Sequence, residues 1–167
     1  NDFKVNDFFN IPEPLIQKEF SRIMSLKDGL KKMSKSELSD LSRINLTDDK
    51  DQIINKIKKA KTDSFPIPSE EQKLKDRPEA ENLLGIYSSI SNQKLEKTLI
   101  EFAGKNFSDL KSQLAEILSD KISPISDEIK KLINDQNYLD KVLAEGAFKA
   151  EEIAGKKIKE MKKIIGF

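Results

Sequence analysis

The residues whose types and spacing suit chemistry lie between positions 27 and 36. Residues 27–35 hold four lysines and one aspartate, which makes this short segment locally basic. Lys32 and Lys35 are three residues apart and flank Ser34, so a single turn of a loop places both ammonium groups on one anion. Ser34 and Ser36 add hydroxyl donors, and Gly29 lets the preceding turn bend freely. We call residues 32–36 the lysine loop.

Two cations on one loop suit phosphoryl and nucleotidyl transfer. Negative charge accumulates on the leaving group of these reactions, and protein cations stabilise it there. The alternative interpretation is a solvated basic loop, because lysine-rich loops are common on protein surfaces. Composition and spacing leave both interpretations open.

The composition excludes several other kinds of chemistry. The 167 residues include no cysteine and no histidine, which removes disulfides, thiolate nucleophiles and the commonest general base and transition-metal ligand. We therefore predict no residue that binds a metal ion directly. Lysine and arginine total 30 against 29 acidic residues, so any binding to nucleic acid must come from local clusters. With no membrane-spanning apolar run and no signal peptide, we expect a cytoplasmic protein without a membrane partner.

A short strand is expected to position the lysine loop. Arg22 to Leu26 is a compact apolar run that ends in turn residues, a pattern of a buried strand, although its length also fits a short helix. Residues 27–46 are polar without periodicity and predict a long loop. Upstream, the prolines predict an extended connection followed by a short helix around Ile16 to Phe20. The chain opens at Asn1 without an initiating methionine, as expected of a piece of a longer protein.

From Thr47 onward the pattern is helical. Thr47 suits the N-cap of a first helix. Further helices are expected over about 79–90, about 94–102 and from 107, with an interruption or kink at Pro124. The last helix is expected from about Asn137, and its inner apolar face is formed by Leu139, Val142, Leu143, Ala147, Ala150, Ile153, Ala154, Ile158, Met161 and Ile165. No fixed repeat is present, so the series predicts a mainly α fold with a helical bundle from residue 47 to the end.

The pentapeptide of the lysine loop, Lys-Met-Ser-Lys-Ser, resembles the second signature of class I aminoacyl-tRNA synthetases. Its flanks resemble the tryptophanyl enzymes of that class, in the same order and over essentially the whole chain. The segments concerned are Arg22 to Gly29, Arg43 to Leu46, Asp48-Asp49, Thr62 to Ser64, Arg77 to Glu79, Asn82 to Leu84 and Leu139 to Ala150. The first, glycine-rich signature of the class is missing from this sequence.

The resemblance implies a tryptophan–tRNA ligase that uses ATP, with Mg²⁺ bound through the phosphates, together with L-tryptophan and tRNA-Trp. It implies a cytoplasmic homodimer with no DNA or membrane partner. Residues 1–46 are then the C-terminal remnant of a Rossmann-type catalytic domain, with its last strand and signature loop. Residues 47–167 are the helical anticodon-binding domain. The tryptophan pocket lies mostly outside this sequence, so the chain alone is expected to be inactive, and no tRNA-contacting residue is identified.

By the same resemblance, Lys32 and Lys35 are catalytic residues that hold the ATP phosphates and stabilise departing pyrophosphate. Met33 cradles the adenine mainly through its backbone, and Ser34 and Ser36 order the loop or touch phosphate. Ile23 matches the family position whose backbone reads the adenine ring, which leaves its side chain free to pack. The implied ATP-binding set is therefore Ile23, Lys32, Met33, Ser34, Lys35 and Ser36.

Two other functions stay open at this stage. A tyrosyl-tRNA synthetase fragment shares the architecture, and only flanking segments such as Thr62 to Ser64 favour the tryptophanyl enzyme. The second is a helical RNA-binding or scaffold module without catalysis, although the near-neutral net charge argues against strong autonomous binding to nucleic acid. Asn82 is expected to be a structural amide. The basic run of Lys56, Lys58, Lys59 and Lys61 and the six lysines from Lys149 onward are either solvated helix faces or phosphate contacts.

Overall fold

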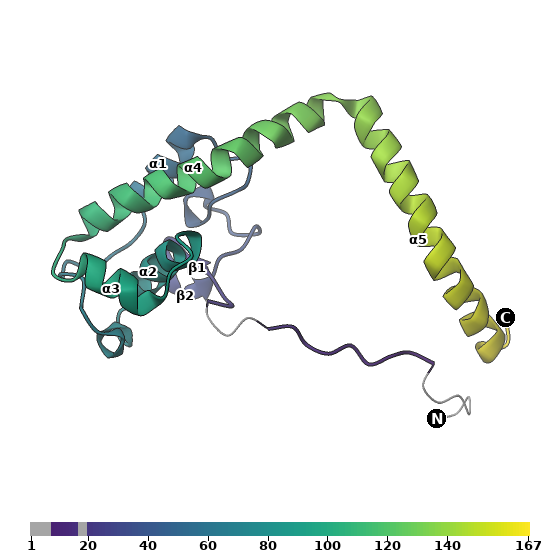
Figure 1. Cartoon of the computed structure of the whole chain (residues 1–167), viewed down its shortest axis with the longest axis horizontal. Helices are drawn as coiled ribbons and strands as arrows, with labels where there is room; N and C mark the ends of the chain where they lie inside the picture. The colour runs from purple at the N-terminus through teal and green to yellow at the C-terminus, as the bar shows by residue number, and fades with distance from the viewer. Residues whose placement is uncertain (1–7, 17–19) are drawn as a thin grey trace. The chain divides into compact units, whose positions relative to one another are not determined.

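The computed structural model describes residues 8–16 and 20–167. The chain forms two compact units, one of Asn1–Leu15 with Lys130–Phe167 and the other of Ile16–Ile129 (Figure 1). The helix expected around Ile16 to Phe20 falls on residues 17–19, outside the described residues. The predicted domain boundary after residue 46 lies within the second unit and stays a prediction.

Helices dominate the described residues, which confirms the expected mainly α fold. In chain order the elements are β1 (Met24–Ser25), β2 (Asp28–Lys32), η1 (Asp40–Ser42), α1 (Lys50–Lys58), η2 (Glu71–Leu74), α2 (Pro78–Ile90), α3 (Leu95–Phe102), α4 (Phe107–Asn134) and α5 (Gln136–Ile165).

A hairpin replaces the single strand and long loop that the sequence predicts. β1 pairs with β2 in antiparallel fashion, with Met24 opposite Lys32 and Ser25 opposite Asp28. The prediction of a loop from residue 27 was therefore wrong for residues 28–32. Four of the five β2 residues are polar or exposed, and only Gly29 is buried, so hydrogen bonding to β1 rather than a buried face defines this strand.

The core of the second unit lies between α1, α2, α3 and α4. Ile53 and Ile57 of α1 are fully buried, as are Leu84 of α2 and Leu110 and Leu114 of α4. The Tyr87 ring of α2 meets the edge of the Phe102 ring of α3, with 4.9 Å between their centroids. These contacts confirm a packed helical assembly for this part of the chain (Figure 1).

The first helix begins two residues later than predicted. Asp49, not Thr47, is the N-cap of α1, and its carboxylate accepts a hydrogen bond from the Gln52 N–H at 2.8 Å. The Gln52 side chain in turn accepts from the Asp49 N–H at 2.9 Å, which completes a capping box. Because two further acidic residues stand beside it, the pattern of the sequence did not single out Asp49.

The last helix was expected from about Asn137 and begins at Gln136. α4 continues through Pro124, so the interruption predicted there was wrong, and the alternative of a kink stays a prediction. No residue of α5 is buried, so the apolar face predicted as its inner side is not part of the core. An apolar stripe shows that a helix has a side to cover, but it does not identify the covering segment. No helix in the described ranges is long and apolar enough to cross a membrane.

Candidate functional site

The hairpin brings the two residues expected to read adenine together. Met33 follows directly after β2, and Ile23 precedes β1. The Met33 N–H donates a hydrogen bond to the Ile23 carbonyl at 3.0 Å, one step beyond the strand pairing. Ile23 is 42% exposed, so it does not pack in the core, where a strand residue is commonly found. Ile23 and Met33, ten residues apart in sequence, thus lie opposite each other at the open end of the hairpin, which we call its edge.

Asn82 on α2 clamps the strand beside this edge. The Met24 N–H donates to the Asn82 Oδ1 at 2.9 Å, and the Asn82 Nδ2 donates to the Met24 carbonyl at 2.8 Å. The amide therefore acts as a neighbouring strand would, satisfying both backbone groups of one residue. This is the structural role that the sequence predicted for Asn82, although the partner 58 residues away was not predictable.

The hairpin lies directly on the start of α2. A Cβ on Gly29 would lie 2.6 Å from the Glu79 backbone nitrogen, so only glycine permits this approach. The Glu79 Oε1 lies 2.7 Å from the Lys61 Nζ. A hydrogen bond from Lys61 lowers the pKa of the Glu79 carboxyl. At the hairpin turn, the Leu26 N–H donates to the Ser42 carbonyl at 2.9 Å, and the Leu26 carbonyl accepts from the Lys61 N–H at 2.7 Å.

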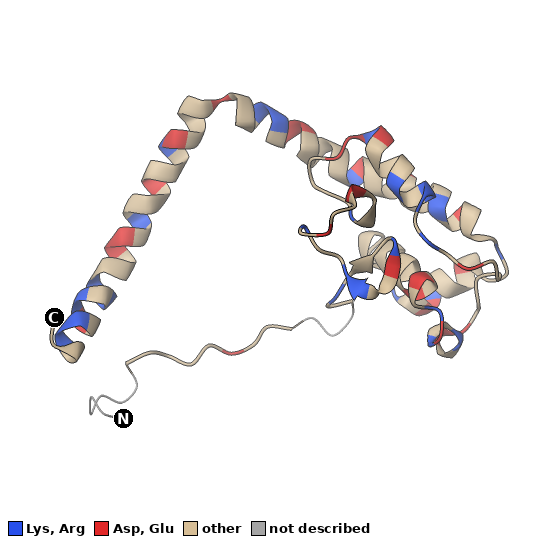
Figure 2. Ribbon diagram, turned by 180° about the vertical axis from the view of Figure 1, so that it is seen from behind, with Lys and Arg blue, Asp and Glu red and all other residues tan. Residues whose placement is uncertain are grey.

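Within the lysine loop, Lys32, Lys35 and Ser36 are exposed, whereas Met33 and Ser34 are half-buried. The Ser34 and Ser36 hydroxyl oxygens are 2.9 Å apart, and the Ser36 N–H donates to the Ser34 Oγ at 3.3 Å. Lys32 and Lys35 are both exposed, and neither forms an ion pair with any other described residue. Basic residues gather at the hairpin in Figure 2. The loop thus offers two unneutralised ammonium groups beside the edge formed by Ile23 and Met33.

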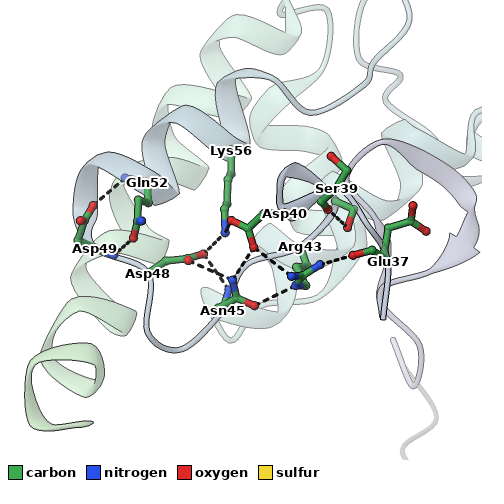
Figure 3. Close-up of polar contacts among 10 residues, drawn as sticks. Glu37, Ser39, Asp40, Arg43, Asn45, Asp48, Asp49, Gln52 and Lys56 are labelled. Carbon is green, nitrogen blue, oxygen red and sulfur yellow. Dashed lines mark hydrogen bonds and ion pairs between the residues drawn. The ribbon is translucent and has the colours of Figure 1, made fainter. Parts of the chain in front are cut away.

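A polar network follows the loop and ends on a buried lysine (Figure 3). The Lys56 Nζ of α1 lies 2.6 Å from the Asp48 Oδ2 and 2.7 Å from the Asp40 Oδ2. The Asn45 amide nitrogen donates to both aspartates, at 3.0 Å to Asp40 and 3.2 Å to Asp48. Hydrogen bonds, first that from Lys56 and then that from Asn45, lower the pKa of the Asp40 carboxyl.

Arg43 connects this network to the lysine loop. Its Nη2 lies 3.1 Å from the Asp40 Oδ1, and its Nε donates to the Asn45 Oδ1 at 3.1 Å. Its Nη1 donates to the carbonyl of Glu37, the residue directly after the loop, at 2.9 Å. Side chains from residues 40 to 56 therefore meet at the downstream end of the loop.

Sequence reasoning missed Lys56. Its side chain is 3% exposed, whereas Lys58 and Lys59 are exposed, so the basic run on α1 is not a single face. The available signal was helical spacing, because position 56 lies beside the apolar positions 53, 57 and 60. Asp63 in the Thr62 to Ser64 segment is likewise structural, since Arg77 grips its carboxylate at 2.8 and 2.6 Å.

The chain is similar to known proteins of one family. The family described as tRNA synthetases class I (W and Y) matches residues 1–123. A tryptophan–tRNA ligase of Brucella melitensis is 49% identical over 99% of this chain and 47% of its own length. A second, from Rickettsia conorii, is 48% identical over 96% of this chain and 48% of its own length. The chain thus spans about half the length of these relatives, in their C-terminal part.

A solved structure shows the same fold. The crystal structure of tryptophanyl-tRNA synthetase from Mycoplasma pneumoniae matches with a TM-score of 0.75 and 26% identity, over 90% of this chain and 45% of that one. A match over residues 1–123 together with these relatives shows that the chain belongs to the class I tRNA synthetases of the tryptophanyl and tyrosyl group. Within that group, the curated relatives that it resembles are tryptophan–tRNA ligases.

Proposed function

We propose that this chain supplies the ATP-binding loop and helical domain of a tryptophan–tRNA ligase, which activates tryptophan with ATP and transfers it to tRNA-Trp. The observation that carries the proposal is the hairpin that joins Ile23 to Met33 beside two exposed lysines without ion-pair partners among the described residues. Identity of 49% to a tryptophan–tRNA ligase supports the choice of amino acid.

The proposed chemistry places charge where the lysines are. The tryptophan carboxylate attacks the α-phosphorus of ATP, the bond to the oxygen bridging the α- and β-phosphates breaks, and that electron pair leaves with pyrophosphate. Lys32 and Lys35 bind the pyrophosphate oxygens, on which negative charge grows in the transition state. Ser34 and Ser36 shape the turn that carries Lys35. Mg²⁺ arrives bound to the ATP phosphates.

Adenine binding falls to the edge of the hairpin. The Ile23 and Met33 backbones lie side by side there, and Asn82 keeps the neighbouring Met24 in place. A rigid edge of this kind lowers the cost of binding, because its groups need not be ordered when the ligand arrives. In this proposal the hairpin edge binds the adenine base, and the exposed lysines bind the phosphates.

The proposal extends to the architecture and assembly that the resemblance implies. Residues 1–46 end the catalytic domain, and residues 47–167 form the anticodon-binding domain. The complete enzyme is a cytoplasmic homodimer, and the mass of the purified full-length protein in solution tests that state. No residue is assigned to tRNA recognition.

The decisive experiment uses the full-length enzyme that contains this chain. We expect exchange of labelled pyrophosphate into ATP that depends on tryptophan, and no exchange with tyrosine. Exchange with tyrosine alone would assign the chain to the tyrosyl branch, whose sequences the same family includes. Absence of exchange with either amino acid, in a folded protein that binds RNA, would favour the non-catalytic helical module.

A further inference from the structure

The lysine loop is fixed at both of its ends. At the upstream end, Lys32 pairs with Met24 in the hairpin. At the downstream end, the Glu37 carbonyl accepts the hydrogen bond from the Arg43 Nη1. Between these points, the side-chain hydrogen bonds among the described residues are those between Ser34 and Ser36. Lys35 thus lies on a short segment between a strand residue and a carbonyl that each have a bonding partner.

The downstream carbonyl is held by a path that starts on α1. Lys56 lies 2.7 Å from the Asp40 Oδ2, and the other oxygen of Asp40 lies 3.1 Å from the Arg43 Nη2. Arg43 then donates to the Glu37 carbonyl. Figure 3 shows these side chains converging from α1 and from the segment that follows the loop. Each link involves at least one charged group, and such contacts are shorter and stronger than those between neutral groups.

Burial of Lys56 calls for an explanation beyond stability. A buried ion pair contributes little net stability, because desolvation of the charges offsets their attraction, and an apolar residue of similar size often serves as well. In some proteins such a pair instead specifies one arrangement, because removal of either partner leaves an uncompensated buried charge. Here the arrangement includes Asp40, whose side chain is 56% exposed and which Lys56 contacts together with Arg43 and Asn45.

We infer that Lys56 is a positioning residue of the adenylation step, acting through Asp40 and Arg43 on the carbonyl from which the lysine loop pivots. This inference rests on the proposed function of the loop. Lys56 touches no reacting atom; it sets where Lys35 stands when pyrophosphate leaves. A small misplacement of a transition-state group is costly, because catalysis by positioning is sensitive to about 1 Å.

The test is a mutant cycle in the full-length enzyme. The variants are Asp40→Asn, Arg43→Gln and Lys56→Met, each made alone and combined with Lys35→Ala. Lys50→Met, which removes an exposed lysine from the same helix, is the matched control. The measurement is the single-turnover rate of tryptophanyl-adenylate formation at saturating ATP and tryptophan, together with tryptophan affinity and melting temperature.

We expect Asp40→Asn, Arg43→Gln and Lys56→Met each to slow adenylate formation about tenfold, with tryptophan affinity unchanged. The same changes should cost little further rate when Lys35 is already alanine, because they act through it. Amide hydrogen exchange at residues 34–37 should rise in all three variants. Lys50→Met should leave all of these values unchanged. If Lys56→Met does not fold, Asp40→Asn carries the test, because its side chain is largely exposed.

Three results would overturn the inference. One is an unchanged adenylation rate in Arg43→Gln and Asp40→Asn. Another is a loss of adenylation rate that is as large in the Lys35→Ala background as in the wild-type enzyme, because the network then does not act through Lys35. The third is a lower melting temperature without any effect on rate, which marks a merely structural network. If the wild-type enzyme is active, these results leave the proposed function intact; if it shows no tryptophan-dependent exchange, both fail together.

Discussion

The hairpin and the lysine loop adjoin in sequence but differ in how their polar groups are hydrogen-bonded. In the hairpin, the backbone N–H and carbonyl of Met24 both bond to the Asn82 side chain, and those of Leu26 bond to the backbones of Ser42 and Lys61. In the loop, the serines bond only to each other or to their own turn, and the lysines are exposed. A hairpin with bonding partners at Met24 and Leu26 thus carries exposed cations that no described acidic residue pairs. Such a division suits a site that must bind, react and release.

The largest expected effect comes from separating this half-site from the remainder of the enzyme. Residues 1–167 alone should give no measurable tryptophan-dependent pyrophosphate exchange, because two lysines stabilise a leaving group only when both reactants are held against it. The full-length enzyme, assayed at the same concentration, is the control. Measurable exchange by the isolated chain would show that the loop does not depend on a second half-site.

Asn82→Ala tests the frame. It removes both bonds to Met24 and should lower the free energy of unfolding by about 2 kcal/mol, because two backbone groups lose their partners. Chemical denaturation of the variant measures this loss. Ser89→Ala, at an exposed position of the same helix, should change stability by less than about 0.5 kcal/mol. Equal effects at the two positions would mean that the amide does not clamp the strand.

Asp49→Ala tests the capping box of α1, the helix that carries Lys56. Loss of the cap should cost about 1 kcal/mol in the free energy of unfolding. Asp49→Asn keeps an acceptor at the cap and should cost much less. A loss with asparagine as large as that with alanine would point to the charge rather than the cap.

The smallest expected effect is a pH dependence of stability. A bidentate hydrogen bond from Arg77 lowers the pKa of the Asp63 carboxyl below its ordinary value of 3.8. The stabilisation is therefore present above that value and is lost as the pH falls through the lower, folded-state pKa. Because the pair is partly exposed, it should contribute less than about 1 kcal/mol. The melting-temperature difference between wild type and Arg77→Met should thus shrink on acidification, and a constant difference would contradict this account.

Much of the helical fold was predictable because its signals are local. The second helix was expected from Glu79 and begins at Pro78, and the third was expected from Lys94 and begins at Leu95. Apolar residues at helical spacing, with proline near the start of α2, are sufficient for such predictions. The lysine loop was recognisable because its five residues are consecutive. Its catalytic and ATP-binding roles stay predictions.

Partners that are distant in sequence were not predictable. β2 is a strand because it bonds to β1, and its own residues give no strand pattern. Lys56 looks like its neighbours Lys58 and Lys59 until the fold places Asp40 and Asp48 around it. The apolar face of α5 was easy to find, but its periodicity does not say what covers it.

The most direct test of the central claim is the effect of Lys35→Ala in the full-length enzyme. Pre-steady-state kinetics should show adenylate formation slowed by about 10²–10³, the cost of removing one preorganised transition-state donor. Tryptophan binding should change little, because the interaction grows only as pyrophosphate leaves. The melting temperature should also hold, since Lys35 is exposed and forms no ion pair with any described residue. A near-normal adenylation rate in this variant would contradict the role of the lysine loop.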